Sequence, residues 1–271
     1  AHKAHWGLLL ARTDMDATKH DGLSYFIIDM KQPGVETQPL KQMNGYASFN
    51  QVFLTDAEVL PDFQVAELGD GWKVATTTLM HERRAADSLR AWGQVPDTDG
   101  PIYDQERAEV ETTMAPYKWY PQRAGRVDLI MQRAKETGAI KDPAVRQEIA
   151  KLMTLHKSAE WTARRARSAQ EQGKPQGPEG SLGKLAASNV ARAAAKVHTM
   201  ISGADSMLSG DDSPENGTVA EVLISFPASS IAGGTDEIQK NIISERVLDM
   251  PKETRFDAGK PFKDIPRNTI S

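Results

Sequence analysis

The sequence contains no cysteine among its 271 residues. Disulfides, thiolate metal sites and a thiol nucleophile are therefore excluded. There is also no surplus of basic residues, since the formal net charge is −4, so nucleic acid is not an expected partner. The longest apolar runs, such as residues 8–11, are far too short to span a bilayer. We therefore expect a cytoplasmic protein without stable membrane insertion.

Two further absences concern the start of the chain and metal binding. The first six residues, AHKAHW, contain no initiator methionine and resemble no secretory signal. The chain runs almost directly into a predicted strand, which indicates a fragment of a longer protein. The six histidines lack a shared spacing with acidic residues, so we predict surface or core histidines and no metal site.

The first part of the chain has the pattern of β-structure. Short apolar segments separated by turn residues predict strands at 7–13, 23–30, 35–40 and 51–55. About four strands bury little by themselves, so we expect part of an antiparallel sandwich or barrel.

After Pro61 the apolar spacing becomes helical. It predicts helices at 71–94, 127–137, 144–172, 182–201, 218–226 and 236–249, with an irregular segment at 95–125. The predicted fold is α+β. It has a partial β domain at 1–62, an all-α up-down bundle at 63–252 and an extended C-terminal tail at 253–271.

The most informative segment is SIAGGTDEIQKNIISER, residues 230–246. Gly233 and Gly234 can adopt backbone angles that other residues avoid, and they let a ligand approach the main chain. Thr235 is a predicted helix N-cap, and Asp236 and Glu237 suit the positive end of a helix. The local pattern alone favours an ordinary capped turn.

An ordered set of short motifs resembles the acyl-CoA dehydrogenase family. They are WGLLLART (6–13), PGV (33–35), MNG (43–45), VFLTD (52–56), GDGW (69–72), ER (82–83), GGTDEIQ (233–239) and ER (245–246). Each is weak alone, but together they cover nearly the whole chain. The first part resembles the family's middle β domain and the rest its C-terminal helical domain. The family's N-terminal helical domain has no counterpart here.

The resemblance implies FAD-dependent oxidation of an acyl-CoA thioester in lipid metabolism. A base removes the α-proton, and a cofactor must accept the hydride because no side chain can. The expected electron acceptor is an electron-transferring flavoprotein, with oxygen as a variant. Members of the family are usually tetramers, so a homodimer or homotetramer is expected.

The resemblance also assigns the base. Many members carry a glutamate at the position of Gly233, whereas others have glycine there and place the glutamate on the helix after the β domain. The matching residue is Glu82. Helical spacing independently places it on an apolar stripe with Ala75, Leu79, Ala86 and Leu89. A lone carboxylate there is costly unless it is paired or functional. The alternative role is a salt bridge to Arg83, Arg84 or another helix.

The remaining site residues follow from the family pattern. The resemblance implies that the Gly233 N–H holds the thioester carbonyl, with Gly234 beside it, and that Arg83 borders the substrate. Thr235 and Glu237 match positions that contact the flavin dinucleotide. A phosphate directly on this helix start is disfavoured, because acidic side chains already occupy it. Each residue also has an alternative structural role. Gly233 would be a turn glycine, Arg83 would form an ion pair, and Thr235 and Glu237 would serve helix capping.

Two departures from the family pattern favour a rival hypothesis. An Arg-x-x-Phe-Gly motif that reaches the flavin of a neighbouring subunit is replaced by RAKETG (133–138), so Arg133 is not assigned. A later Gln-x-x-Gly-Gly flavin loop is replaced by SMLSGDDS (206–213). Some bacterial relatives form mixed assemblies, and in such an assembly this chain would be a non-catalytic structural subunit.

Overall fold

A computed structural model of the chain describes residues 1–47, 49–92, 98–114, 124–174 and 177–266; the side chains of 83–92 and 112–114 are outside this description. Internal contacts divide the chain into two compact units. The first, here called the strand unit, comprises Ala1–Tyr117 and Glu253–Ser271. The second, the helical unit, comprises Lys118–Lys252. The compact units therefore do not follow the change from strand to helix near residue 62.

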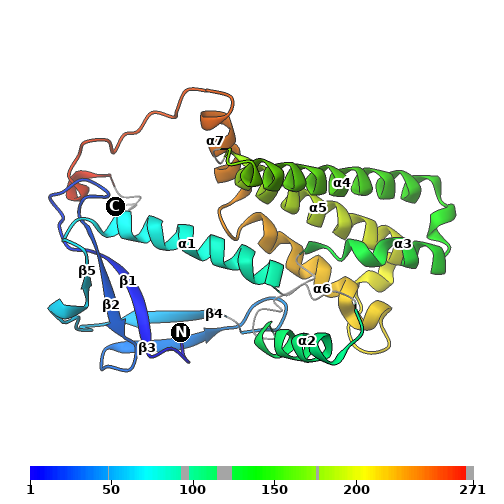
Figure 1. Ribbon diagram of the computed structural model, residues 1–271, viewed down its shortest axis with the longest axis horizontal. Helices are drawn as coiled ribbons and strands as arrows, with labels where there is room; N and C mark the ends of the chain where they lie inside the picture. Colours follow the sequence, from blue (N-terminus) through cyan, green and yellow to red (C-terminus); the bar gives the residue numbers. More distant parts are fainter. Residues whose placement is uncertain (48, 93–97, 115–123, 175–176, 267–271) are drawn as a thin grey trace. The chain divides into compact units, whose positions relative to one another are not determined.

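The strand unit contains two antiparallel sheets (Figure 1). The first has the order β1-β2-β5, formed by Trp6–Arg12, Leu23–Asp29 and Gln64–Val65, with Leu8 opposite Ile27. The second is the β3-β4 hairpin, Val35–Leu40 with Phe49–Leu54. All four predicted strands are confirmed, and β5 is a short addition to them.

Helix α1, Gly71–Trp92, follows these strands and packs against β2. The connection is fixed by Ser24, whose buried hydroxyl lies 2.6 Å from the Thr13 hydroxyl and accepts the Gly69 N–H at 3.0 Å. These two bonds join β2 to the residue that follows β1 and to the loop that starts α1. The N-terminal half of α1 is therefore anchored to the sheet.

Helix α2, Pro101–Met114, lies in the segment that the sequence predicted to be irregular, and that prediction is wrong. Proline at the first position of a helix is favoured, because its missing N–H would have no partner there. Asp104 in the first turn adds a favourable charge at the helix N-terminus. Pro101 therefore marks a helix start in this segment.

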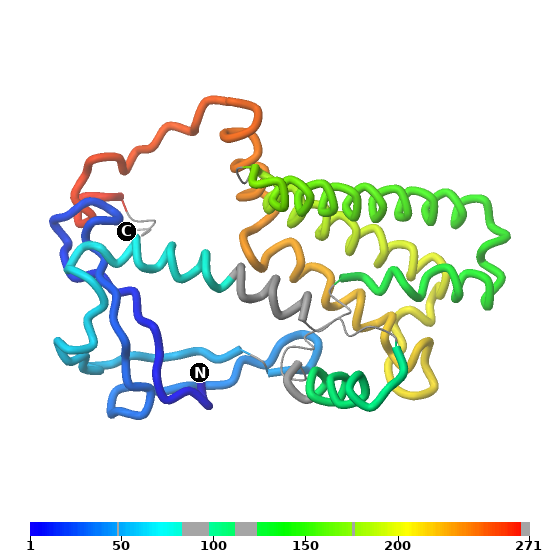
Figure 2. Tube along the Cα trace, in the orientation of Figure 1, coloured from blue at the N-terminus to red at the C-terminus, as the bar shows by residue number. Residues whose placement is uncertain are grey.

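The C-terminal tail lies along the loop between β1 and β2 (Figure 2). Phe262 donates its N–H to the Ala17 carbonyl at 2.9 Å, and its ring lies 3.5 Å from the Arg12 guanidinium carbon. Arg255 and Lys19 both pair with Asp257 at 3.3 Å. The Arg255 hydrogen bond, together with Lys19 and against partial desolvation, lowers the pKa of Asp257 to about 2. The tail is thus held by charge and main-chain bonds.

The helical unit contains α3 (Val127–Glu136), α4 (Pro143–Glu171), α5 (Glu179–Ser202), α6 (Thr218–Ser225) and α7 (Asp236–Arg246). Helices α4 and α5 lie side by side (Figure 1). Their facing side chains, with those of α3, form a core of Ile130, Ala134, Val145, Ile149, Leu152, Val190, Ala194, Val197 and Ile201. Each large apolar side chain buried in this way contributes roughly 1.5–3 kcal/mol to stability.

Two buried polar side chains connect the helices of this unit. His198 on α5 places Nε2 at 3.0 Å from the Gly125 carbonyl and 3.2 Å from that of Arg126, so Nε2 carries the proton and donates. Burial lowers the pKa of His198, although these two carbonyls act to raise it. Arg133 on α3 donates to Glu215 at 3.2 Å and to Ser202 at 2.8 Å. The arginine of the altered family motif therefore serves the packing of its own unit.

Within the described ranges, no helix is long and apolar enough to cross a membrane.

Candidate functional site

The two glycines before α7 form an open turn in the helical unit. Gly233 and Gly234 have φ of +69° and +91°, in the region that only glycine adopts at low cost. A methyl group built on Gly233 would meet only the Lys184 side chain, at 3.8 Å, among the described residues. Neither glycine donates its N–H to a group within the described part of the chain. The turn therefore presents free main-chain donors and space beside them.

Thr235 caps α7, as predicted: its hydroxyl accepts the Ile238 N–H at 3.3 Å. Gln239, which is 7% exposed, donates to the Gly233 carbonyl at 3.3 Å. Glu237 is exposed and has no ion pair or hydrogen bond among the described residues. Near the start of α7, Gln239 thus holds the Gly233 carbonyl, whereas the Glu237 carboxylate stays available.

Asp236 points inward and lies in a group of polar side chains, here called the Asp236 cluster: Lys184, Ser188, Arg192, Ser230 and Asp236. Arg192 donates to the carboxylate at 3.1 Å and to the Ser230 hydroxyl at 3.1 Å. Lys184 Nζ lies 3.8 Å from the other carboxylate oxygen. Asp236 is 7% exposed, and its Oδ1 has no hydrogen-bond partner among the described residues.

Charge compensation keeps Asp236 ionised. Burial acts to raise the pKa of Asp236, but the hydroxyls of Ser188 and Ser230, the Arg192 guanidinium and the Lys184 charge together lower it. One of the two acidic groups at the start of α7 is therefore neutralised from inside the unit. The negative charge presented to solvent there is that of Glu237.

Sequence reasoning missed the Asp236 cluster, although a signal was present. Lys184, Ser188 and Arg192 recur every four residues, which places three polar side chains on one face of α5. The same helix buries Val190, Ala194 and Val197 on another face. A regular polar stripe on a helix that is otherwise well buried indicates a polar contact.

Glu82, the predicted base, lies on α1 of the strand unit and is exposed. No described residue forms an ion pair or hydrogen bond with it. Leu79, which the helical spacing places on the same face, is 51% exposed, whereas Ala75 is partly buried. The side chains of Ala86 and Leu89 are outside the described residues, as is that of Arg83. Among the described members of the predicted apolar stripe, Leu79 is therefore open to solvent beside Glu82.

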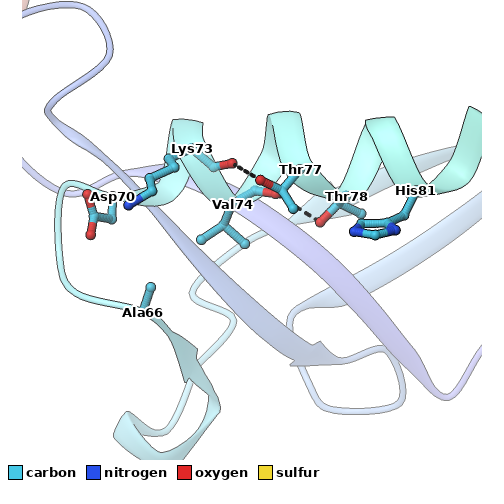
Figure 3. Close-up of a pocket in the computed structure, with 7 residues that line it drawn as sticks. All are labelled: Ala66, Asp70, Lys73, Val74, Thr77, Thr78 and His81. Atoms are coloured by element: carbon cyan, nitrogen blue, oxygen red, sulfur yellow. Dashed lines mark hydrogen bonds between the residues drawn. The ribbon is translucent and has the colours of Figure 1, made fainter. Parts of the chain in front are cut away.

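A shallow pocket lies along another face of α1, beside the helix start (Figure 3). It encloses about 250 Å³ and is lined by Ala66, Asp70, Lys73, Val74, Thr77, Thr78 and His81. The two threonine hydroxyls donate to main-chain carbonyls one turn earlier, so they are already satisfied. Glu82 does not line this pocket. Nowhere in the described ranges do three histidine, aspartate or glutamate side chains gather as a metal site.

The sequence and structure were compared with known proteins. Residues 123–248 match the family described as "Acyl-CoA dehydrogenase, C-terminal domain". The relative Acyl-CoA dehydrogenase IpdE1 of Mycobacterium tuberculosis is 30% identical over 261 residues, covering 94% of this chain and 58% of the relative. Acyl-CoA dehydrogenase FadE34 of the same organism is 32% identical, covering 93% of this chain and 30% of the relative.

A solved structure named Tcur3481-Tcur3483 steroid ACAD has a TM-score of 0.69 at 19% identity, covering 93% of this chain and 58% of that one. At this identity the likeness concerns the fold. The likeness supports the fold described above, an antiparallel β region followed by a helical domain.

The chain belongs to the acyl-CoA dehydrogenase family. It spans little more than half the length of the relative IpdE1. Gly233, Gly234, Thr235 and Glu237 lie together inside the segment that matches the C-terminal domain. Glu82 and Arg83 lie outside that segment, on the strand unit.

Proposed function

We propose that the protein is an FAD-dependent acyl-CoA dehydrogenase that introduces a double bond between the α and β carbons of an acyl-CoA. The proposal is carried by the turn at Gly233, where free N–H groups and open space precede a capped helix within the matched domain. An acyl thioester has a carbonyl oxygen that such donors can bind. The family supplies the reaction type.

The residues at the start of α7 fit a flavin dinucleotide. Glu237 is an exposed acceptor, which suits ribose hydroxyls or the adenine amino group. Thr235 lies beside it and already uses one lone pair of its hydroxyl for the cap. The Glu237 charge disfavours a phosphate at this helix start, so we assign Thr235 and Glu237 to hydroxyl, amide or adenine contacts. When bound, the flavin accepts the hydride from the β-carbon.

Gly233 would hold the substrate carbonyl through its main-chain N–H. As the α-proton leaves, negative charge develops on that oxygen, and a fixed donor stabilises this charge more than it stabilises the neutral thioester. Glycine supplies the same N–H as glutamate would. Its lack of a side chain leaves space beside the turn.

Glu82 would remove the α-proton. Position 233 carries no base, and Glu82 is a carboxylate without a partner among the described residues. A carboxylate becomes a stronger base when an apolar ligand excludes water from it, because desolvation disfavours its charged form. Arg83, the next residue, is proposed to border the substrate.

The partners are proposed from the same chemistry. The proposed electron acceptor is an electron-transferring flavoprotein in the cytoplasm. The protein is expected to act as a homodimer or homotetramer. One neighbour in fold is named a steroid ACAD, so a sterol-derived acyl-CoA belongs beside straight and branched chains in the first substrate panel.

The test is the visible spectrum of the full-length protein under anaerobic conditions. Bound oxidised flavin should be present, and it should lose its absorption when an acyl-CoA is added. A protein that binds flavin and is not bleached by any acyl-CoA class would contradict the proposal.

A second candidate function is a structural subunit of a mixed acyl-CoA dehydrogenase assembly. It is favoured because a neighbour in fold, with a TM-score of 0.62, is described as the ChsE4-ChsE5 complex from Mycobacterium tuberculosis, an assembly of two named proteins. Complete absence of flavin from the purified full-length protein would support this second candidate.

A further inference from the structure

The segments on both sides of the Gly233-Gly234 turn are bonded to a single face of α5. Before the turn, the Ser229 carbonyl accepts hydrogen bonds from the Lys184 ammonium and from the Ser188 hydroxyl, the latter at 2.8 Å. After the turn, Asp236 pairs with Arg192 at 3.1 Å and lies 3.8 Å from Lys184. The two ends of the turn are thus held by Lys184, Ser188 and Arg192, which follow one another at intervals of about one turn on the same helix.

Lys184 has the central position among these contacts. Its ammonium has three donors. They are directed to the Ser229 carbonyl, to the Ser188 hydroxyl at 3.2 Å and toward the Asp236 carboxylate. It therefore contacts the chain on both sides of the glycines. Its Cε is also the nearest described atom to the space beside Gly233.

Burial strengthens the polar contacts of this cluster. Ser188 is fully buried, Asp236 is 7% exposed and the Lys184 side chain is 22% exposed. Charge-assisted bonds in such surroundings are stronger and less screened than those on an open surface. Glycines at positive φ are the most flexible residues of the backbone, so an open turn containing two of them needs external contacts to keep one conformation.

We propose that Lys184, acting through Ser229 and Asp236, is the positioning residue that holds the Gly233-Gly234 turn in its ligand-binding conformation. Lys184 does not touch the reacting atoms in this proposal; it fixes the direction of the Gly233 N–H. The proposal of a role in turnover rests on the proposed function. The proposal that Lys184 holds the turn does not.

The first test measures the turn directly in the full-length protein. Hydrogen exchange is followed for the amides of residues 231, 232, 238 and 239, which donate to carbonyls or hydroxyls on either side of the turn. Lys184→Met should accelerate these amides at least about tenfold while those of α4 keep their wild-type rates, because local contacts control local opening. Unchanged exchange at the turn would overturn the proposal. Equal acceleration across α4 would also overturn it, since it would mark a general loss of stability.

A matched control is available on the same helix. Lys196 on α5 is ion-paired with Glu148 at 2.8 Å and is 59% exposed, so Lys196→Met removes an ion-paired lysine without touching the turn. In Lys196→Met, the amide exchange rates at the turn should stay within about twofold of wild type, because a surface ion pair contributes little to stability. Lys184→Arg, which retains the charge and donors, should recover much of the protection lost in Lys184→Met.

The second test asks whether the fixed turn matters for catalysis. With an acyl-CoA substrate, Lys184→Met should lower kcat by about tenfold or more and change KM little, because a donor that acts on developing charge affects the transition state most. A change in KM alone would overturn this part. If the wild-type protein dehydrogenates no acyl-CoA, the proposed function fails, and the exchange experiment still decides the role of Lys184.

Discussion

The helical unit and the strand unit bury their apolar side chains to very different degrees. The continuous core runs from Ile130 to Ile201, entirely within the helical unit. In the described part of the strand unit, the buried apolar side chains are Tyr25, Ile28 and Val110. Large apolar side chains such as Leu8 and Leu79 are more than half exposed there.

This difference separates the two halves of the proposed chemistry. The helical unit fixes the Gly233 turn from within, through its own core and the Asp236 cluster. The strand unit leaves Glu82 and Leu79 exposed. The turn proposed to bind the thioester is thus held within its own unit, whereas the surroundings of the proposed base depend on what covers α1. The following predictions test this contrast, from the largest expected effect to the smallest.

Leu152→Ala should destabilise the helical unit by roughly 2–5 kcal/mol, because it removes a fully buried side chain and leaves a cavity. Leu8→Ala, at a position 61% exposed in the strand unit, should change stability by no more than about 0.5 kcal/mol. Hydrogen exchange of the α4 and α5 amides measures the opening of the helical unit separately. Similar losses from both substitutions would remove the contrast between the units.

Gly234→Ala should cost about 2 kcal/mol, because φ is positive and the new methyl would lie 2.6 Å from the buried Gln239 amide. Gly233→Ala should cost only about 1 kcal/mol, from backbone strain alone, because its methyl would have room. Urea unfolding of the two variants provides the comparison. Equal losses would show that the turn lacks the open space assigned to position 233.

The buried His198 should make the helical unit lose stability in acid. Its pKa is lowered in the folded state, so the unfolded chain takes up a proton below a pH of about 6.5 while the folded chain does not. The contribution of the buried, neutral His198 to folding stability is therefore fully present above that pH, and it is lost as the pH falls toward the folded-state pKa. The slope can reach about 1.4 kcal/mol per pH unit. Unfolding experiments between pH 7 and pH 5 should show this slope.

His198→Gln should flatten that pH dependence, whereas His156→Gln, at an exposed position on α4, should preserve it. A slope that persists in His198→Gln would assign the acid sensitivity to other groups. One of these is Asp236, whose lowered pKa places its own loss of stability at more acidic pH.

Removing the cap of α7 should have the smallest effect. Thr235→Ala should cost about 1 kcal/mol or less, because the Ile238 N–H loses its acceptor at an exposed helix end. Thr235→Ser retains the hydroxyl and should be close to wild type. Thermal unfolding measures both variants, and a loss of several kcal/mol in Thr235→Ala would mean that Thr235 does more than cap the helix.

The sequence predicted the regular elements well, because turn residues and apolar spacing are local signals. The four main strands and the cap at Thr235 are examples. Helix α2 was missed because the whole segment 95–125 was interpreted as irregular, although a proline such as Pro101 is favoured at a helix start. The Asp236 cluster was missed because it joins residues far apart in sequence, and the pairing of Asp236 with Arg192 becomes visible only in three dimensions.

Exchange of the substrate α-proton tests the central claim most directly, because it isolates the step assigned to Glu82. The full-length protein is incubated anaerobically in D₂O with an acyl-CoA, and deuterium at the α-carbon is measured by mass spectrometry. Wild-type protein and Glu109→Gln, an exposed glutamate variant on α2, should both introduce deuterium. Glu82→Gln should abolish the exchange while retaining bound flavin. Unchanged exchange in Glu82→Gln would contradict the assignment of the base.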